Sequence, residues 1–321
     1  MRGAKALLAV MVVVALGVAG YLVWDRSGVQ RFLAPEGCTA TVGDQVVDLD
    51  LEQSGNAALI AAISVQRGMP ARAATIALAT AIQESKLYNL EHGDRDSLGL
   101  FQQRPSQGWG TEKQILDPVY SINTFYDALE KVPGYRDMPV TEAAQTVQRS
   151  GFPEAYADHE ADARALASSL TGQTTGGAFT CLVRHSGEPG PARLNEVGLT
   201  ATADDVRREL NAVFGDPPMG GFEPRGVDSG HMNGSAHYEG RAVDVFVRPI
   251  SEANKVRGWA IAAYLVAQAD RLDIETVIFD ARIWRASRSE DGWRDYRVPS
   301  SSRGDRAILE HRDHVHVDVR G

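Results

Sequence analysis

Two short strings near the C-terminus, well separated along the chain, contain the side chains of one metal site. Residues 235–244 read Ser-Ala-His-Tyr-Glu-Gly-Arg-Ala-Val-Asp, and residues 313–316 read Asp-His-Val-His. A catalytic zinc site uses three protein ligands and leaves the fourth position for water. His237, Asp244 and His316 supply two nitrogens and one oxygen, a set that suits zinc. If they bind one ion, the two strings must lie side by side in the fold.

The local pattern predicts that two adjacent strands bring these ligands together. Residues 242–247 read Ala-Val-Asp-Val-Phe-Val, and residues 315–319 form a second β-rich run. Side chains alternate between the faces of a strand. Asp244 therefore has a defined face in the first strand, and His314 shares a face with His316. Metal-assisted hydrolysis is the chemistry that this arrangement indicates.

The same strings resemble the zinc peptidases of the D-Ala-D-Ala carboxypeptidase and L-Ala-D-Glu endopeptidase type, which share a fold with the hedgehog signalling domain. The family pattern, S-x-H-x-x-G-x-A-x-D followed by a late H-x-H, is filled at every fixed position. The resemblance covers about residues 195–321. It implies an α+β fold, Zn²⁺ held by His237, Asp244 and His316, and cleavage of a stem-peptide amide. His231 is a candidate hydrogen-bond donor to a ligand.

The resemblance also implies roles for residues around the ion. Asp313, three residues before the last ligand, is the expected base, and His314 would steady the base or the oxyanion. Ser235 is expected to touch the substrate. Arg225 is our choice for an arginine that binds the substrate carboxylate. Glu310 is a competing candidate for the base, because hedgehog-like members carry their acid at that position.

The remainder of this C-terminal region reads as helices beside a small, mostly antiparallel sheet. Thr202 is expected to cap a helix that ends near Phe214, and Ser251 a longer one that ends near Asp270. The further β-rich runs are 275–279 and 281–284.

Residues 38–185 carry helical signals and are expected to form a compact all-α domain. No run of alternating apolar residues long enough for a sheet occurs between residues 54 and 170. The expected helices are 70–85, one capped by Asp117 and ending near Lys131, one opening at Thr141, and one from Pro153 to near Leu170.

Glu84 lies at the end of the first of these helices, where a carboxyl group is a candidate general acid for glycoside cleavage. Residues 83–85 (Gln-Glu-Ser) and 99–102 (Gly-Leu-Phe-Gln) resemble the soluble lytic transglycosylase and goose-type lysozyme group. The longer run at 96–110, D-S-x-G-L-F-Q-Q-R-P-S-x-G-W-G, resembles the lysozyme-like module of actinobacterial surface and phage tail proteins.

By this resemblance Glu84 is the acid, and Gln102, Gln103 and Trp109 line a glycan groove. One departure concerns the late Y-N-A-G segment of the transglycosylases, because the corresponding residues 147–153 lack the asparagine. No second catalytic carboxylate is evident either. Binding of the glycan without cleavage therefore stays open.

The two cysteines, Cys38 and Cys181, bracket this helical region. An even cysteine count in an exported protein suggests a disulfide, which would tie the two ends of the region together. The alternative is a pair of unpaired buried thiols.

The first residues predict export. Arg2 and Lys5 precede an uncharged apolar run from Ala6 to Trp24. This pattern fits a signal anchor or a signal peptide, and its length favours the anchor. The positive-inside rule keeps the two cations in the cytoplasm, so the rest of the chain is expected outside it, anchored in the cell membrane or secreted.

Together these patterns predict a multidomain protein of α and α+β class. Its segments are 1–37, a signal anchor or signal peptide with a tether; 38–185, the lysozyme-like domain; and 186–321, the zinc peptidase-like domain. The net charge of −9 argues against nucleic acid as a partner. Peptidoglycan contains both expected bond types, so we expect a peptidoglycan hydrolase. The alternative is a non-catalytic wall-binding or scaffold protein that keeps both modules.

Overall fold

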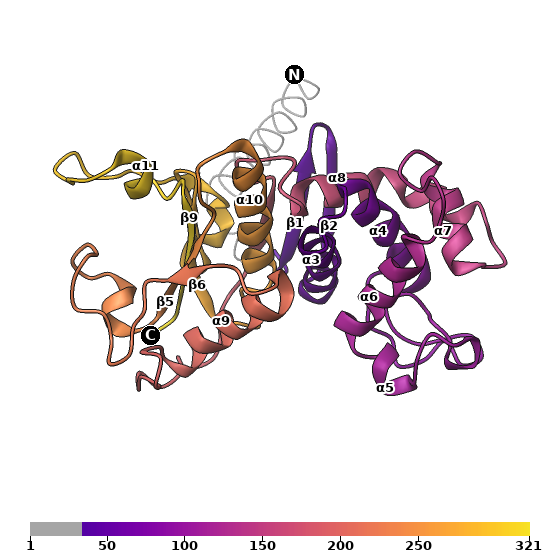
Figure 1. Ribbon diagram of the computed structural model, residues 1–321, viewed down its shortest axis with the longest axis horizontal. Coiled ribbons are helices and arrows are strands. Elements are labelled where there is room, and N and C mark those ends of the chain that lie inside the picture. Colours follow the sequence, from indigo (N-terminus) through magenta and orange to yellow (C-terminus); the bar gives the residue numbers. More distant parts are fainter. Residues whose placement is uncertain (1–33) are drawn as a thin grey trace, which may run out of the picture. The chain divides into compact units, whose positions relative to one another are not determined.

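The computed structural model describes residues 34–321, of which residues 37–321 pack as one compact unit (Figure 1). It contains two antiparallel sheets, with strand orders β2-β1-β3 and β4-β5-β9-β6-β7-β8. The strands are β1 (Gly37–Val42), β2 (Gln45–Leu49), β3 (Phe179–Leu182), β4 (Met219–Gly220), β5 (Ala242–Phe246), β6 (Ile274–Phe279), β7 (Arg282–Arg285), β8 (Arg294–Asp295) and β9 (His314–Val319).

Helices form most of the first half of the unit and cover the second sheet. The α-helices are α3 (Leu51–Gln66), α4 (Ala71–Ser85), α5 (Glu112–Ile115), α6 (Pro118–Leu129), α7 (Val140–Gln148), α8 (Glu160–Leu170), α9 (Ala201–Phe214), α10 (Glu252–Ala267) and α11 (Arg306–Leu309). The 3₁₀ turns are η1 (Pro105–Gln107), η2 (Ala155–His159), η3 (Ala236–Glu239) and η4 (Ala286–Asp291).

The prediction of an all-α region over residues 38–185 is wrong at both ends of that region. The β1–β2 hairpin precedes the helices, and β3 follows them and pairs with β1. Each strand is only four to six residues long. A strand that short carries too few alternations to stand out from loop sequence.

The disulfide prediction is confirmed. Cys38 and Cys181 face each other in the β1–β3 register and are bonded. Segments separated by 143 residues are thereby joined.

The expected helices of the first half are present, with shifted ends. Asp117 caps α6 by accepting the backbone N–H of Val119 at 2.9 Å, as predicted. The helix expected from Pro153 is divided into η2 and α8. The unpredicted start of α3 has a capping box, in which Asp50 and Gln53 each accept a hydrogen bond from the backbone N–H of the other.

The second sheet is accompanied by helices, as expected for an α+β region. Helix α10 packs on β6 and β9. Ser251 caps α10, as predicted. The cap of α9 is Thr200 and not Thr202, because the Thr200 hydroxyl accepts the N–H of Ala203 at 3.3 Å. The two-residue strands β4 and β8, at the edges of the sheet, were not predicted.

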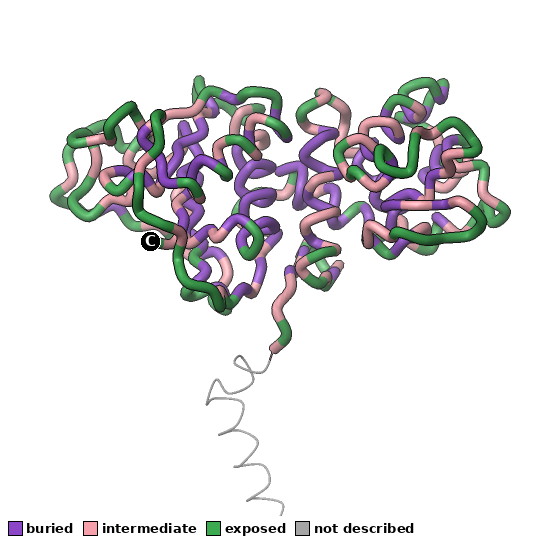
Figure 2. Tube along the Cα trace, turned by 90° about the horizontal axis from the view of Figure 1, so that it is seen from below, coloured by how far each residue is buried: buried purple, intermediate pink, exposed green. Residues whose placement is uncertain are grey.

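Most of the buried apolar residues form one continuous cluster with members in α3, α4, α10 and both sheets. Figure 2 shows the buried segments along the chain. Helix α3 packs on α10, and the Gln268 amide donates to the Gly55 carbonyl at 3.1 Å. The boundary between residues 185 and 186 stays a prediction.

The predicted N-terminal anchor or signal segment lies outside the described residues. Within residues 34–321, none of the helices combines the length and apolar character needed to span a bilayer.

Candidate metal centre

The register of β5 and β9 brings the three predicted ligands together. Asp244 lies opposite His316 in this pair of strands. The Oδ1 atom of Asp244 is 3.0 Å from Nδ1 of His316 and 3.3 Å from Nε2 of His237. The two histidine nitrogens are 3.2 Å apart. All three side chains are buried.

These three atoms form a nearly equilateral triangle whose size fits a zinc ion. Tetrahedral zinc with ligands at about 2.0–2.1 Å separates the ligand atoms by about 3.3 Å. The observed sides of 3.0–3.3 Å therefore match one face of such a tetrahedron. A fourth position remains beyond this face.

His237 is held by one hydrogen bond from its backbone N–H and another from its ring. It lies in η3, whose first N–H groups are capped by Ser235: the Ser235 hydroxyl accepts the backbone N–H of His237 at 3.4 Å. Nδ1 of His237 is 2.7 Å from the carbonyl oxygen of Gly221, which can only accept a hydrogen bond. Nδ1 therefore carries the hydrogen, and Nε2 presents its lone pair to the site.

His316 is oriented by a carboxylate that the sequence analysis missed. Its Nε2 is 3.2 Å from Oδ2 of Asp318, two residues further along β9 and on the same face. Burial lowers the pKa of His316, but the hydrogen bonds to Asp244 and Asp318 outweigh burial and raise it to about 10. Burial also opposes the charge on Asp244, yet the neighbouring imidazoles of His237 and His316 hold its pKa well below the usual range.

Asp313 and His314 form a hydrogen-bonded pair beside the triangle. Nδ1 of His314 is 2.7 Å from Oδ1 of Asp313, and Nε2 of His314 is 3.9 Å from Oδ1 of Asp244. Arg248 donates to the other Asp313 oxygen at 2.7 Å. Burial raises the pKa of Asp313, but His314 and then Arg248 bring it below its ordinary value. Nε2 of His314 is therefore the atom of this pair that faces the proposed ligands, because both oxygens of Asp313 are already hydrogen-bonded to other groups.

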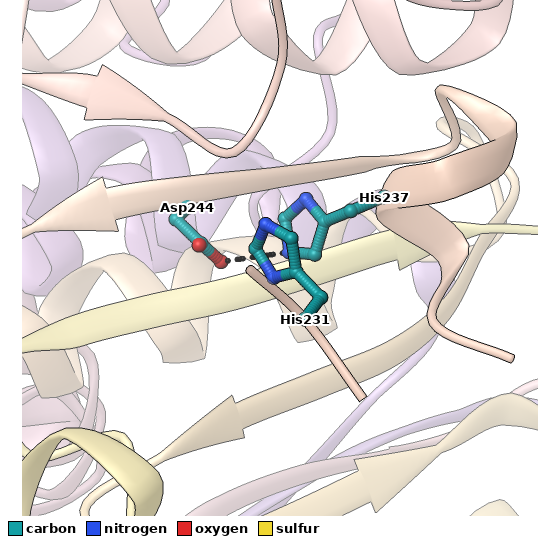
Figure 3. A group of neighbouring side chains, drawn as sticks. All are labelled: His231, His237 and Asp244. Atoms are coloured by element: carbon teal, nitrogen blue, oxygen red, sulfur yellow. Dashed lines mark ion pairs between the residues drawn. The ribbon is translucent and has the colours of Figure 1, made fainter. Parts of the chain in front are cut away.

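Another histidine, His231, lies beside His237 and Asp244 (Figure 3). His231, His237 and Asp244 each place a ligand atom within 4.8 Å of the other two, so this group could bind a metal ion. The His231 ring stacks on that of His237, with centroids 3.9 Å apart and 21° between the planes. Burial and the neighbouring His237 lower the pKa of His231.

The competing base, Glu310, is held in ion pairs. Its two oxygens lie 2.7 Å from Nε of Arg306 and 2.8 Å from Nε of Arg312. These arginines, Arg312 first, lower the pKa of Glu310. Arg225 is exposed, in a turn with a φ of 77°.

His311 packs against the site without a predicted role. Its ring centroid is 4.6 Å from that of His314. Burial, followed by the nearby His316 and His314, lowers the pKa of His311 to about 2. Nδ1 of His311 finds no hydrogen-bond partner in the described part of the chain.

In residues 38–185, which we call the helical half, the two segments that carry the lysozyme-like resemblance, 83–85 and 99–102, contact each other. The Ser85 hydroxyl donates to the Leu100 carbonyl at 2.8 Å, joining the end of α4 to the loop that follows. The half-buried Glu84 accepts a hydrogen bond of 2.6 Å from the hydroxyl of Tyr156. Burial, together with Glu84, raises the pKa of Tyr156, so this hydroxyl keeps its proton.

The three residues expected to line a glycan groove differ from one another in burial and in hydrogen-bond partners. Gln103 is 2% exposed, and its amide donates to the Ser121 carbonyl at 3.1 Å. Gln102 is half-buried and donates to the Gly99 carbonyl. Trp109 is partly buried against the core. Gln103 therefore holds α6 in place and does not face solvent.

One family model is similar to part of the chain. Residues 195–306 match the family model described as the VldE C-terminal domain. The match includes His231, His237 and Asp244, and it stops before β9. A search of curated proteins found no match to this chain.

Proposed function

We propose that the chain is an extracytoplasmic peptidoglycan hydrolase that cleaves a stem-peptide amide with the help of zinc. The observation that carries this proposal is the triangle of ligand atoms from His237, Asp244 and His316, which has the size of a tetrahedral face. When bound, zinc supplies a Lewis acid for the scissile carbonyl and lowers the pKa of a water molecule.

His314 is placed to move the proton in this reaction. Its Nδ1 hydrogen is held by Asp313, so its Nε2 can accept the proton of the attacking water and return it to the leaving amine. Asp313 then orients His314 and stabilises its charged form. Both oxygens of Asp313 are already bonded, which supports this role over that of a direct base.

Glycan cleavage or glycan binding by the helical half completes the proposal. The support is the placement of Glu84 beside the loop at residues 98–103, with Tyr156 holding one of its oxygens. The Cys38–Cys181 bond supports an oxidising compartment outside the cytoplasm.

The test is digestion of purified peptidoglycan sacculi, with mass spectrometry of the released fragments. We expect wild-type protein to release peptide fragments, to lose this activity in EDTA and to regain it with zinc. His316→Ala should lose both bound zinc and cleavage. Zinc binding without any released fragment would leave the non-catalytic wall-binding alternative.

The base is tested by three substitutions. We expect His314→Ala to lower kcat by about 10²–10⁴, the usual contribution of a general acid–base group. Asp313→Ala should cost less than His314→Ala, and Glu310→Gln should keep wild-type turnover. Wild-type turnover in His314→Ala would make Asp313 the base, as the sequence pattern predicted.

Glycan cleavage is tested separately in a His316→Ala background, where the peptidase is silent. Release of disaccharide fragments that Glu84→Gln abolishes would support a catalytic acid. Binding to sacculi without release, unchanged by Glu84→Gln, would limit the helical half to wall binding.

A further inference from the structure

Two histidines at the site, His231 and His311, have no function in the reaction proposed above, and His231 lies beside two of the proposed ligands. His231 lies in the loop between β4 and η3, and its ring covers the ring of His237 (Figure 3). The two rings stack with their centroids 3.9 Å apart and 21° between their planes, so the His231 imidazole lies directly beside a proposed ligand. One nitrogen of His231 lies within 4.8 Å of the ligand atoms of both His237 and Asp244.

The backbone of His231 is fastened to the helical turn that carries a ligand. The N–H of His231 donates to the Tyr238 hydroxyl at 3.0 Å, and this hydroxyl donates to the His231 carbonyl at 2.6 Å. Tyr238 is next to His237 in η3. The loop is therefore held over the site by one side chain on both sides of the His231 α-carbon.

The loop has a glycine before His231 and another after it. Gly230 and Gly234 flank His231 with φ values of 91° and 76°, a region that glycine adopts without strain. A Cβ at either glycine would meet no described atom within 4 Å. Met232, between them, is 51% exposed.

We propose that His231 is a fourth protein ligand of the metal, which closes the site at rest. Zinc takes four ligands, imidazole is among those it prefers, and four protein ligands make a closed site. Breaking the Tyr238 clamp would withdraw the imidazole, and a water oxygen would take its place. Both are neutral donors, so the exchange changes no charge. This inference rests on the metal site of the proposed function and adds its regulation.

Cobalt substitution tests the ligand directly, because the d–d bands of Co²⁺ depend on the number and kind of its ligands. The full chain is loaded with Co²⁺ as wild type, His231→Ala, His231→Cys and the control His92→Ala. His92 is an exposed histidine in the helical half. We expect His231→Cys to show a thiolate-to-cobalt charge-transfer band, since only a coordinated sulfur gives one.

Zinc affinity and turnover give two further readouts. Measured against a chromogenic chelator, His231→Ala should bind zinc at least about tenfold more weakly, as for loss of a group that supports a metal site. Its kcat/KM on stem peptides should rise several-fold, and Tyr238→Phe should raise it as well. His92→Ala should match wild type throughout.

The inference is overturned if His231→Ala keeps the wild-type cobalt spectrum and zinc affinity, or if His231→Cys gives no charge-transfer band. Failure of the proposed function is seen separately, as metal binding without hydrolysis in the wild type and in all variants. In that case the spectra still decide whether His231 is a ligand.

Discussion

At the level of single residues, the candidate metal site depends on the groups that orient its proposed ligands. His316 lies between two carboxylates, Asp244 and Asp318, which keep it protonated in the metal-free protein. A metal ion must displace the proton on Nδ1, because a protonated nitrogen has no lone pair to donate. Asp244 is already ionised, since its pKa is low.

We therefore predict that zinc binding releases a proton from His316 at neutral pH. With a pKa of about 10 for His316, zinc affinity should rise about tenfold per pH unit between pH 7 and 9. The same raised pKa stabilises the metal-free fold fully below about pH 6.5, and this contribution is lost as the pH rises through about 10. Calorimetry in buffers of different ionisation enthalpy counts the protons released.

Asp318→Asn is the matched control for that experiment. It removes one of the two carboxylates that raise the pKa of His316. The variant should release fewer protons than wild type when titrated with zinc at pH 8. It should also bind zinc about 10–100-fold more weakly, as expected for loss of the group that orients a ligand. Equal proton counts in the two proteins would contradict the prediction.

At the level of elements, the site depends on a close approach between the turn after β4 and the ligands on η3 and β5. Gly221 follows β4 with a φ of 79°, and its carbonyl holds Nδ1 of His237. A Cβ at Gly221 would lie 2.3 Å from Cε1 of His237 and 3.1 Å from Oδ2 of Asp244. Only glycine fits there without displacing both ligands.

Gly221→Ala should therefore damage the metal site. We expect zinc affinity to fall by at least about tenfold, because two ligands move and one loses its orienting acceptor. Gly43→Ala is the control: its φ of 60° is also positive, but no described atom lies within 4 Å of the added Cβ. Both variants carry backbone strain, so only a loss of affinity specific to Gly221→Ala supports the close approach. Chelator competition measures both affinities.

The sequence pointed to three side chains that the structure brings together, and to little of what orients them. The sequence could predict His237, Asp244 and His316 because it shows directly both the type of a metal-binding side chain and its spacing from the next. The role of Gly221 could not be predicted, since nothing in Met-Gly-Gly specifies which backbone passes beside a histidine. Asp318 could have been predicted from the sequence, because residues 314, 316 and 318 lie on the same face of a strand. Arg248 reaches Asp313 only through the β5–β9 pairing.

At the level of the whole molecule, one covalent bond closes the helical half. The bond between Cys38 and Cys181 joins β1 to β3, so residues 38–181 form a covalently closed loop. The Trp284 indole donates to the Cys181 carbonyl at 3.2 Å, which connects β3 to the second sheet. Losing the bond should therefore affect the compact unit as a whole.

Removing this disulfide should lower the free energy of unfolding by about 2–5 kcal/mol, because the unfolded chain regains the entropy that the closed loop removes. The double variant Cys38→Ser with Cys181→Ser is compared with wild type by urea denaturation, with and without reductant. Reductant should destabilise the wild type toward the variant and leave the variant unchanged. Zinc affinity should be similar in both at low urea, because no metal ligand touches the bond. A variant as stable as oxidised wild type would contradict this prediction and show that non-covalent packing holds the unit together without the bond.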